Sequence, residues 1–368
     1  MEVSPAVRGP LISAWSVVSP FGMDVSAFGN GLRSGTAAAT ALDPEEWKVP
    51  FENACLVEGF SNREVLGRKG TRSMDRVTGL AVAAVGRLLQ DADGERISGV
   101  GQDAALVLGT STGSAQSIMD FTRDSLTQEK PFFVDPMRFP NTVMNCAAGQ
   151  SAIWHKLKGP NTTIAGGRAS GLLALNYALR LKKSGHARTV LFGAVEEFSS
   201  ARAWLEWHTR GQDESDAVLG EGAAVLLLES GEVAEEHGRD GLAEVLGLEC
   251  GVYHEAGTEA TVLADCVRRV LERTGVRPDD VRYLSHSQAA GARGAAEQDA
   301  LTDVLGNHQP ELVRCADLIG DTHAAAAAFQ IAAVLVAAEG REDAKGQIAL
   351  ITSVDRDGVV GCAVLRLC

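Results

Sequence analysis

The sequence predicts an α/β protein in which helices pack against both faces of a sheet. Short apolar runs, typical of buried strands, alternate with segments of helical period along the whole chain. The second half of the chain repeats the alternation of the first. The 368 residues are 45% hydrophobic and 22% charged, so enough apolar surface is available to offset the entropy of ordering the chain. These three observations favour a sheet sandwiched by helices and exclude a disordered protein.

In the first half, a short apolar strand leads into the turn SPFG at residues 19–22. A long amphipathic helix follows, because Val77, Leu80, Ala84 and Leu88 recur at three- and four-residue spacing. A later helix ends at Gly159-Pro160, where the proline prevents its continuation. The predicted strands are residues 11–18, 104–108, 161–165, 189–195 and 223–228, and the predicted helices are residues 73–92, 142–157 and 169–183.

In the second half, an apolar run of fifteen residues, 324–338, is interrupted only by Gln330. A membrane span needs about 20 residues, so we expect a buried helix here. Asp321 or Thr322 is expected to cap it, because either side chain can accept from free backbone N–H groups. The other predicted elements are strands at residues 242–252, 281–285, 348–354 and 359–367, and helices at residues 259–273 and 295–305.

The polar stretch 230–240 is the best candidate boundary within the chain. It separates two segments that each alternate strands with helices. We therefore expect two halves, residues 1–235 and 236–368.

Charge and cysteine usage exclude several classes of protein. The net charge is −14, whereas a nucleic-acid binder needs an excess of Lys and Arg to neutralise phosphates. The seven cysteines are odd in number and form no CxxC pair, which indicates reduced thiols in the cytoplasm and neither a disulfide framework nor a metal site. No phosphate loop and no dinucleotide fingerprint is present, so we expect no cofactor.

Several motifs follow one another in a defined order. They are AWSVVSPFG at residues 14–22, MDR at 74–76, FPNTVMN at 139–145, GPNTTI at 159–164, ASG at 169–171, GAVEE at 193–197 and GEGA at 220–223. In order and spacing the chain resembles the β-ketoacyl synthases from about Leu11 to Leu367. The resemblance implies a thiolase-type fold, with two related halves in a five-layered α-β-α-β-α arrangement, and a dimer.

The chemistry of that family needs a Cys at a helix N-terminus, which takes the acyl chain as a thiolate. It also needs two His residues, which stabilise the charge that develops when carbon dioxide is lost, and a Lys that supports the second His. By resemblance the Cys position holds Arg168, the second His position Asp321 and the Lys position Ala316, and only the first His is kept, as His286. Arg cannot be a nucleophile, because its guanidinium stays protonated.

Two glycine-rich loops of the family are also replaced. The loop after His286 reads SQAA at residues 287–290, and the C-terminal loop reads VDRDG at residues 354–358. A small shift in alignment would bring His323 or Cys146 into a catalytic position. We expect instead a buried small thiol at Cys146 and a locally hydrogen-bonded His323.

Arg168 occupies a deep site at a helix start, where an unpaired cation is costly and poorly matched to the helix dipole. Asp321 holds a position that the family directs toward the same site. We therefore expect an Arg168–Asp321 ion pair that replaces the Cys–His pair and plugs the pocket. His286 is expected to be a structural remnant.

A ketosynthase-like chain without its nucleophile resembles the chain length factors, the inactive partners of active ketosynthases in type II polyketide and polyene biosynthesis. The resemblance implies a heterodimer with an active ketosynthase, whose acyl tunnel this chain would shape at its end, and no condensation by this chain alone. The candidate tunnel and interface residues lie on the helix after Gly113 and in the segment that crosses the interface. They are Ala115, Ile118, Thr122, Arg138, Phe139 and Thr142.

A basic stretch contrasts with the acidic chain and contains Arg63, Arg68, Lys69, Arg72 and Arg76. By electrostatic steering it could receive an acidic acyl carrier protein, directly or through the partner, with Arg68, Lys69 and Arg72 as the candidate patch. The alternative is a solvated charged surface.

Three other functions stay open. A malonyl-carrier-protein decarboxylase of ketosynthase type normally keeps both His residues, so Asp321 argues against it. A structural homodimer would need no ketosynthase partner. A serine hydrolase is suggested by GTSTG at residues 109–113, which fits G-x-S-x-G after a strand, although ketosynthases carry a glycine-rich turn at the same place.

Overall fold

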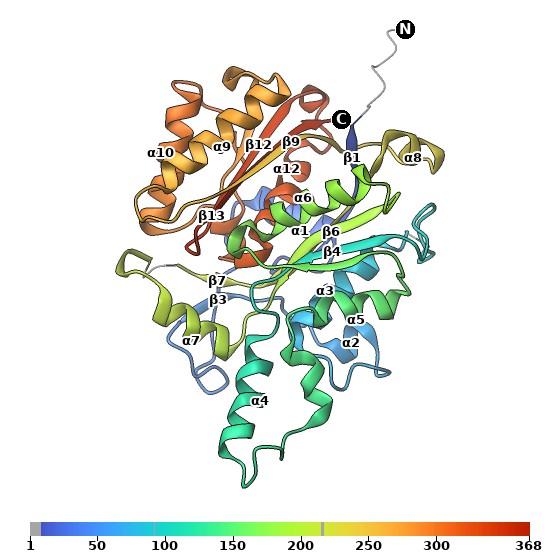
Figure 1. Cartoon of the computed structure of the whole chain (residues 1–368), viewed down its shortest axis with the longest axis vertical. Coiled ribbons are helices and arrows are strands. Elements are labelled where there is room, and N and C mark those ends of the chain that lie inside the picture. Colours follow the sequence, from blue (N-terminus) through green and yellow to red (C-terminus); the bar gives the residue numbers. More distant parts are fainter. Residues whose placement is uncertain (1–8, 92, 215–216) are drawn as a thin grey trace.

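The computed structural model describes residues 9–91, 93–214 and 217–368. Within them a ten-stranded mixed sheet runs through the molecule, in the order β11-β10-β12-β13-β9-β1-β8-β6-β4-β5 (Figure 1). A small second sheet joins β2 (Thr40–Ala41), β3 (Asn53–Cys55) and β7 (Leu219–Gly220).

The large sheet consists of two five-strand units with the same topology. In each unit the spatial order of the strands is first, fifth, fourth, second and third along the chain. The fifth strand pairs antiparallel with the first and the fourth, and the second pairs parallel with the third and the fourth. The first unit contains β1 (Pro10–Val18), β4 (Ala105–Gly109), β5 (Asn161–Ile164), β6 (Val190–Glu196) and β8 (Gly222–Ser230). The second contains β9 (Ala243–Val252), β10 (Val281–Ser285), β11 (Glu311–Leu312), β12 (Ile348–Val354) and β13 (Val359–Leu367).

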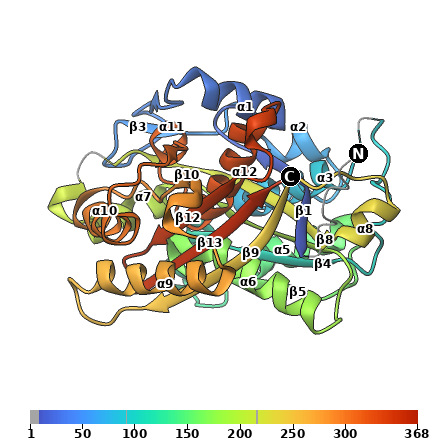
Figure 2. The ribbon, with the colours of Figure 1, turned by 90° about the horizontal axis from the view of Figure 1, so that it is seen from above.

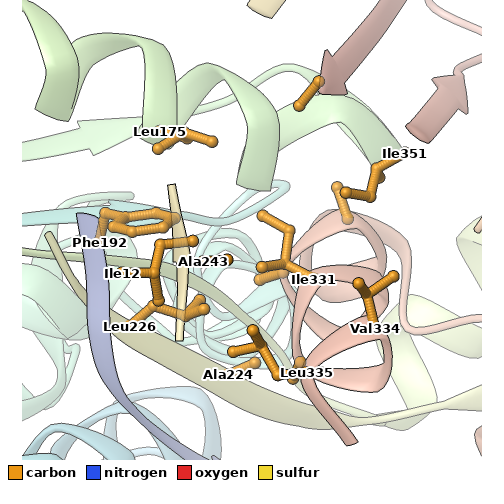
Figure 3. Close-up of a cluster of buried hydrophobic side chains, with 14 of the residues drawn as sticks. Ile12, Leu175, Phe192, Ala224, Leu226, Ala243, Ile331, Val334, Leu335 and Ile351 are labelled. Atoms are coloured by element: carbon orange, nitrogen blue, oxygen red, sulfur yellow. The ribbon is translucent and has the colours of Figure 1, made fainter. Parts of the chain in front are cut away.

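Helices cover both units and form the expected layers (Figure 1), and Figure 2 shows the same ribbon from above. On one outer face, α3 (Arg76–Leu88) and α5 (Cys146–His155) pack on the first unit; on the other, α9 (Glu259–Thr274) and α10 (Gly291–Leu305) pack on the second. Between the units lie α6 (Ser170–Lys183) and α12 (Ala326–Ala338), whose side chains share one core with strands of both (Figure 3). The five-layered thiolase-type fold with two related halves is therefore confirmed.

The central helix α12 explains the apolar run in the sequence. The first eleven residues of α12 are all buried. Ten of them are apolar, and the remaining one is Gln330. The Gln330 amide donates to the carbonyl oxygens of Ser285 (2.8 Å) and Thr352 (3.0 Å), so one polar side chain joins the ends of β10 and β12. No described helix is both long and apolar enough to cross a membrane.

The remaining helices surround this framework. They are α1 (Val25–Ser34), α2 (Asn62–Leu66), α4 (Ala115–Thr127), α7 (Ser200–Thr209), α8 (Gly231–Glu236) and α11 (Ala316–Ile319), with the 3₁₀ turns η1 (Pro136–Thr142), η2 (Gly167–Ala169), η3 (Gln212–Glu214), η4 (Pro278–Asp280), η5 (His323–Ala325) and η6 (Glu342–Ala344). The α4–η1 segment projects from the body of the molecule (Figure 1). The polar stretch 230–240 holds the short helix α8.

The predicted strands agree closely with the structure, but several helix starts were wrong. Helix α3 begins at Arg76 because Asp75 caps it by accepting from the Thr78 N–H. Thr142 ends η1, so α5 begins only at Cys146. Helix α10 begins four residues earlier than expected, at Gly291. Neither Asp321 nor Thr322 caps α12, because η5 intervenes and Asp321 accepts from the His323 N–H instead.

Substitutions that leave a cavity should destabilise the protein most in the helical layer between the two units. Phe329 of α12 is 0% exposed and packs against Phe28, with the ring centroids 5.7 Å apart. We expect Phe329→Ala to lower the free energy of unfolding by about 3–5 kcal/mol, measured by denaturant titration. Phe132→Ala is the control, because Phe132 is 71% exposed and its loss should change the value by less than about 0.5 kcal/mol. Equal effects would contradict this account of the core.

Candidate functional site

Arg168, which the resemblance aligns with the family nucleophile, lies in η2, directly before α6. Arg168 is only 6% exposed there, and a sharp turn with Gly167 at φ +53° precedes it. A Cβ atom on Gly167 would lie 1.9 Å from Cγ of Asp355, so glycine is required both for the backbone conformation and for this close approach. The turn thus holds a buried cation at the start of a helix.

Two carboxylates neutralise Arg168. Its guanidinium forms an ion pair and hydrogen bond with Asp321, which confirms the pair predicted from the sequence. Asp355, from the turn between β12 and β13, is fully buried, and its Oδ1 lies 3.8 Å from Nη1 of Arg168. Asp355 was not predicted as a partner, although the loss of the family's C-terminal glycine-rich loop marked its position.

The two partners stabilise each other's charge. Burial lowers the pKa of Arg168, but the attraction of Asp321 and Asp355 outweighs burial and raises it overall. Burial alone would raise the pKa of Asp321, and Arg168, followed by His323 and Arg202, holds it below its ordinary value. Both groups are therefore charged at neutral pH.

The backbone at the nucleophile position is occupied as well. The Arg168 N–H donates to Oδ1 of Asp355 at 2.8 Å, and Oδ2 of Asp355 accepts from the Asp357 N–H at 2.9 Å. N–H groups at a helix start are the usual donors to a developing oxyanion. Here a buried carboxylate of the same chain holds that donor, so it is not free to stabilise a reacting acyl group.

More charged groups surround the pair. His323 is buried, with Nδ1 3.8 Å from Glu196 and Nε2 3.9 Å from Glu206. Glu206 also pairs with Arg356. Nδ1 of His323 and Oε2 of Glu196 have no hydrogen-bond partner among the residues that the structure describes. The expected local hydrogen bond of His323 is made by its backbone, to Asp321, while its ring lies between two carboxylates.

His286 lies at the end of β10, outside this cluster. Its Nδ1 accepts from the Gln288 N–H at 3.1 Å and lies 3.9 Å from the buried carboxylate of Glu297. Gln288, at φ +52°, accepts from the N–H groups of Cys315 and Ala316, which ties the loop after His286 to the start of α11. At the position where the resemblance places a lysine, Ala316 contributes only its backbone N–H, which donates to Gln288.

A cavity of about 350 Å³ remains above the Arg168–Asp321 pair. The prediction that the pair plugs the pocket was therefore wrong: both residues line the cavity but do not fill it. Cys55 also lines it, and burial raises the pKa of this thiol to about 12, so it is not a thiolate. The apolar part of the lining is Ala37, Ala39, Phe51, Ala217, Val218, Leu219, Ala289, Ala290 and Ala316.

Cys146 is half-buried, so the expectation of a buried thiol was wrong, and its surroundings do not favour a thiolate. Its thiol contacts Thr78 (3.8 Å) and Asn141 (3.5 Å), and burial raises its pKa. Reactive cysteines need a lowered pKa. Among the described residues, no group of three His, Cys, Asp or Glu side chains could hold a metal ion.

A second cavity, of about 680 Å³, lies between the base of α4, η1 and the start of α7. The buried side chain of Glu197 lines it and accepts from Ser114 (3.0 Å) and from the Val77 N–H (3.1 Å). Burial, followed by the charge of Asp75, raises the pKa of Glu197 to about 8. The sequence analysis did not predict this cavity. The motif GAVEE at residues 193–197, which contains Glu197, was noted only for its resemblance to the family.

The six candidate tunnel and interface residues lie in two neighbouring segments. Ala115 is buried at the start of α4, whereas Thr122 is exposed further along the helix. Arg138 and Phe139 are exposed on η1, and Arg138 alone of the six lines the 680 Å³ cavity. Around them the α4–η1–α5 segment exposes a set of large apolar side chains, namely Met119, Leu126, Phe132, Phe133, Met137, Phe139, Val143, Met144 and Ile153.

The basic stretch divides into two parts. Arg63, Arg68, Lys69 and Arg72 are exposed, and no ion pair joins any of them to another described residue. Arg76 instead forms two hydrogen bonds with the buried Glu221 and lies over the Phe60 ring, so it belongs to the framework.

The chain belongs to the β-ketoacyl synthase family. The family's N-terminal domain matches residues 11–234 and its C-terminal domain residues 243–342. A 3-oxoacyl-[acyl-carrier-protein] synthase 2 of Synechocystis is 26% identical over 324 residues, which are 81% of this chain and 77% of the relative. The chloroplastic 3-oxoacyl-[acyl-carrier-protein] synthase I of Arabidopsis thaliana is 27% identical over 83% of this chain and 69% of its own length.

Within that family, the chain is similar to a chain in the solved structure of the ishigamide ketosynthase/chain length factor. The two are 44% identical with a TM-score of 0.91, over 98% of this chain and 99% of the other. A chain of the type II polyketide synthase complex AntDE:AntF, in which an acyl-carrier protein is bound to its ketosynthase, shares the fold at 20% identity and a TM-score of 0.81, over 98% and 100% of the two chains.

Removing one partner of the buried ion pair should lower the free energy of unfolding more than replacing both partners by apolar residues. We expect Asp321→Ala to lower the free energy of unfolding by about 3 kcal/mol or more, because Arg168 then keeps only the more distant carboxylate of Asp355. Arg168→Met with Asp321→Leu should be milder than either single change. Denaturant titrations of the unaltered chain, Arg168→Met, Asp321→Leu and the double variant give the coupling energy, and a value near zero would contradict the pair. The exposed pair Arg188–Glu236 is the control, where Arg188→Ala should cost less than about 1 kcal/mol.

The buried Glu197 should make stability fall as pH rises. Its pKa is raised from an ordinary value of 4.5 to about 8, so between these values the folded chain binds a proton that the unfolded chain has released. The free energy of unfolding should then decrease by up to about 1.4 kcal/mol per pH unit between pH 5 and 8. Glu197→Gln should flatten this dependence in titrations at several pH values. An unchanged slope would show that Glu197 is ionised in the folded protein.

Proposed function

We propose that this chain is a non-catalytic ketosynthase-like subunit, a chain length factor, that pairs with an active ketosynthase. The observation that carries the proposal is Arg168 in place of the nucleophile, with its side chain bound to Asp321 and its N–H bound to Asp355. A decarboxylase of the same fold would need a second histidine where Asp321 forms the ion pair. The complete family scaffold therefore serves an assembly role.

The partner surface of this proposal is the α4–η1–α5 segment. It projects from the body and exposes large apolar side chains such as Phe132, Phe139 and Ile153, which are uncommon on the surface of an isolated protein. An active ketosynthase of the same fold offers a matching face. In the heterodimer, Ala115, Ile118 and Thr122 would lie beside the end of the partner's acyl tunnel, and Arg138, Phe139 and Thr142 would lie in the segment that crosses the interface.

The proposal includes an acyl carrier protein as a second partner, held near Arg68, Lys69 and Arg72. Exposed basic side chains on a chain of net charge −14 support it, since a carrier protein that is acidic would be attracted to such a patch. The seven free cysteines support a reducing compartment, and the proposal therefore includes a cytoplasmic complex.

The isolated chain should form no acyl-enzyme. Incubation with acyl- and malonyl-carrier protein, followed by intact-mass spectrometry, should detect neither a covalent adduct nor a ketoacyl product, because no described cysteine lies at the start of α6. A 3-oxoacyl synthase with its nucleophilic cysteine serves as the positive control. An adduct on any cysteine of this chain would overturn the proposal.

Co-expression with a candidate ketosynthase should yield a heterodimer of one copy of each. A stable interface of this kind should bury roughly 2,000 Å² or more. The mass in solution, measured by light scattering, distinguishes it from a homodimer. Phe139→Asp should lower the yield of heterodimer, whereas Leu312→Asp, an exposed apolar site on β11, should leave it unchanged. A chain that stays monomeric or homodimeric beside its ketosynthase would contradict the proposal.

A further inference from the structure

The ring of His323 lies between two carboxylates and forms a hydrogen bond with neither. Its Nδ1 is 3.8 Å from Oε2 of Glu196, and its Nε2 is 3.9 Å from Oε1 of Glu206. His323 also holds a backbone φ of +43°, in the left-handed region that is strained for a residue with a Cβ atom. Backbone strain of this kind clusters at sites that switch between states, so the position of this buried histidine points to a functional role.

The two carboxylates differ in how firmly they are held. Glu196 ends β6, which pairs with β4 on one side and with β8 on the other, so its backbone is fixed in the sheet. Glu206 lies on α7, a helix on the outside of the molecule that exposes Trp204 and Trp207. A change in hydrogen bonding at the ring would therefore move Glu206 and α7, whereas Glu196 would stay in place.

The charged groups around the ring are short of one positive charge. The carboxylates are Glu196, Glu206, Asp321 and Asp355, and the guanidiniums are Arg168, Arg202 and Arg356. The neighbouring pair Arg293–Glu214 adds one charge of each sign. Helix α12 carries no charged residue, and the charged residues of α6 and β8, which also pack against η5, lie toward their C-terminal ends. A proton on His323 would thus balance the four carboxylates.

Helix α7 connects this ring to the proposed partner face. At the start of α7, the Ala201 N–H donates to Oε1 of Gln116 on α4 at 3.0 Å. Toward the end of α7, Glu206 pairs with Arg356. A shift of α7 at Glu206 therefore reaches α4, which belongs to the α4–η1–α5 segment.

We infer that His323 is a pH-sensitive clasp that holds α7 in place and so sets how tightly the chain pairs with its ketosynthase. A histidine changes its charge between pH 5 and 8, and as an imidazolium it donates from both ring nitrogens. Small rotations then bring Nδ1 to Glu196 and Nε2 to Glu206. The inference rests on the heterodimer of the proposed function and adds a control of its affinity.

The neutral ring has only one N–H, so it can hold only one of the two carboxylates. The buried Glu196 keeps it, because a buried carboxylate without a donor is costly. Glu206 turns instead to Arg356, and α7 moves with it. Pairing with the ketosynthase is therefore tighter at pH 6 than at pH 8.

Two other carboxyl groups bear on this pH range. Burial raises the pKa of Glu206, but Arg202 and then His323 lower it overall, so Glu206 stays ionised between pH 6 and 8. Burial, followed by the charge of Asp75, raises the pKa of Glu197 to about 8, and Glu197 lines the cavity beside the partner face. Because Glu197 titrates in the same range, the test uses Glu197→Gln as its reference chain.

The dissociation constant of the heterodimer is measured by sedimentation of the labelled, co-purified complex over a dilution series at pH 6, 7 and 8. In the Glu197→Gln chain it should rise roughly fivefold or more from pH 6 to pH 8, the lower end of typical coupling between sites. Adding His323→Gln should remove this rise, because an amide does not titrate. His208→Gln is the matched control, since His208 is an exposed histidine on the same helix, and it should leave the rise unchanged. The ketosynthase is the same in every complex, so its own titration cancels in these comparisons.

Two further measurements do not depend on the yield of the His323→Gln chain. Glu206→Gln removes the charge on α7 that the ring holds and should also remove the rise. In the isolated Glu197→Gln chain labelled with ¹⁵N-histidine, NMR should show His323 with protons on both ring nitrogens at pH 6. At pH 8 it should keep only the proton on Nδ1, the nitrogen that faces Glu196.

The possible outcomes separate the clasp from the heterodimer. A dissociation constant that does not change with pH in the Glu197→Gln complex, or that changes equally with and without His323, would overturn the inference and leave the heterodimer standing. A neutral His323 ring protonated on Nε2 would overturn it as well. Failure of the unaltered chain to pair with its ketosynthase at any pH would contradict the proposed function, and the clasp with it.

Discussion

The buried charge of Arg168 is the constraint on which the rest of the site depends. A guanidinium that is 6% exposed at a helix start cannot be left without counter-charge, because desolvation and the helix dipole both oppose it. Asp321 reaches it from the segment before η5, and Asp355 reaches it from the turn between β12 and β13. Both carboxylates come from the second half of the chain, so the pair also joins the two halves.

The thiolase-type fold explains why these groups meet. Helices α6 and α12 form the middle layer, and each begins near the charged cluster, after η2 and η5 respectively. Gly171 of α6 lies so close to α12 that a Cβ would be 2.6 Å from the Ala328 nitrogen. This close packing brings together Arg168 and Asp321, the two positions that the resemblance aligns with the family's nucleophile and second histidine. The family scaffold thus still converges on this site, although an arginine and an aspartate stand where the resemblance places a cysteine and a histidine.

Much of the fold and part of the site could be predicted from the sequence. Strands such as β10 and β12 are short apolar runs with clear limits, and their positions follow from local pattern. Helix starts were less predictable, since the 3₁₀ turns η1 and η5 depend on contacts outside the segment. The Arg168–Asp321 pair could be predicted because the resemblance directs both positions toward the same site. Asp355 could not be predicted, because its bond to the Arg168 N–H spans 187 positions and no motif links the two.

The charges around Arg168 would also oppose a reactive cysteine at the same position. A cysteine restored at position 168 would lie beside Asp321 and the fully buried Asp355, both without their cation. Neighbouring carboxylates and burial both raise a thiol pKa, so such a cysteine would stay protonated and unreactive. Its N–H would still donate to Asp355, and no histidine would stand at position 321. A cysteine at position 168 alone would therefore not restore the family's catalytic arrangement. Asp321 and Asp355 would also have to change.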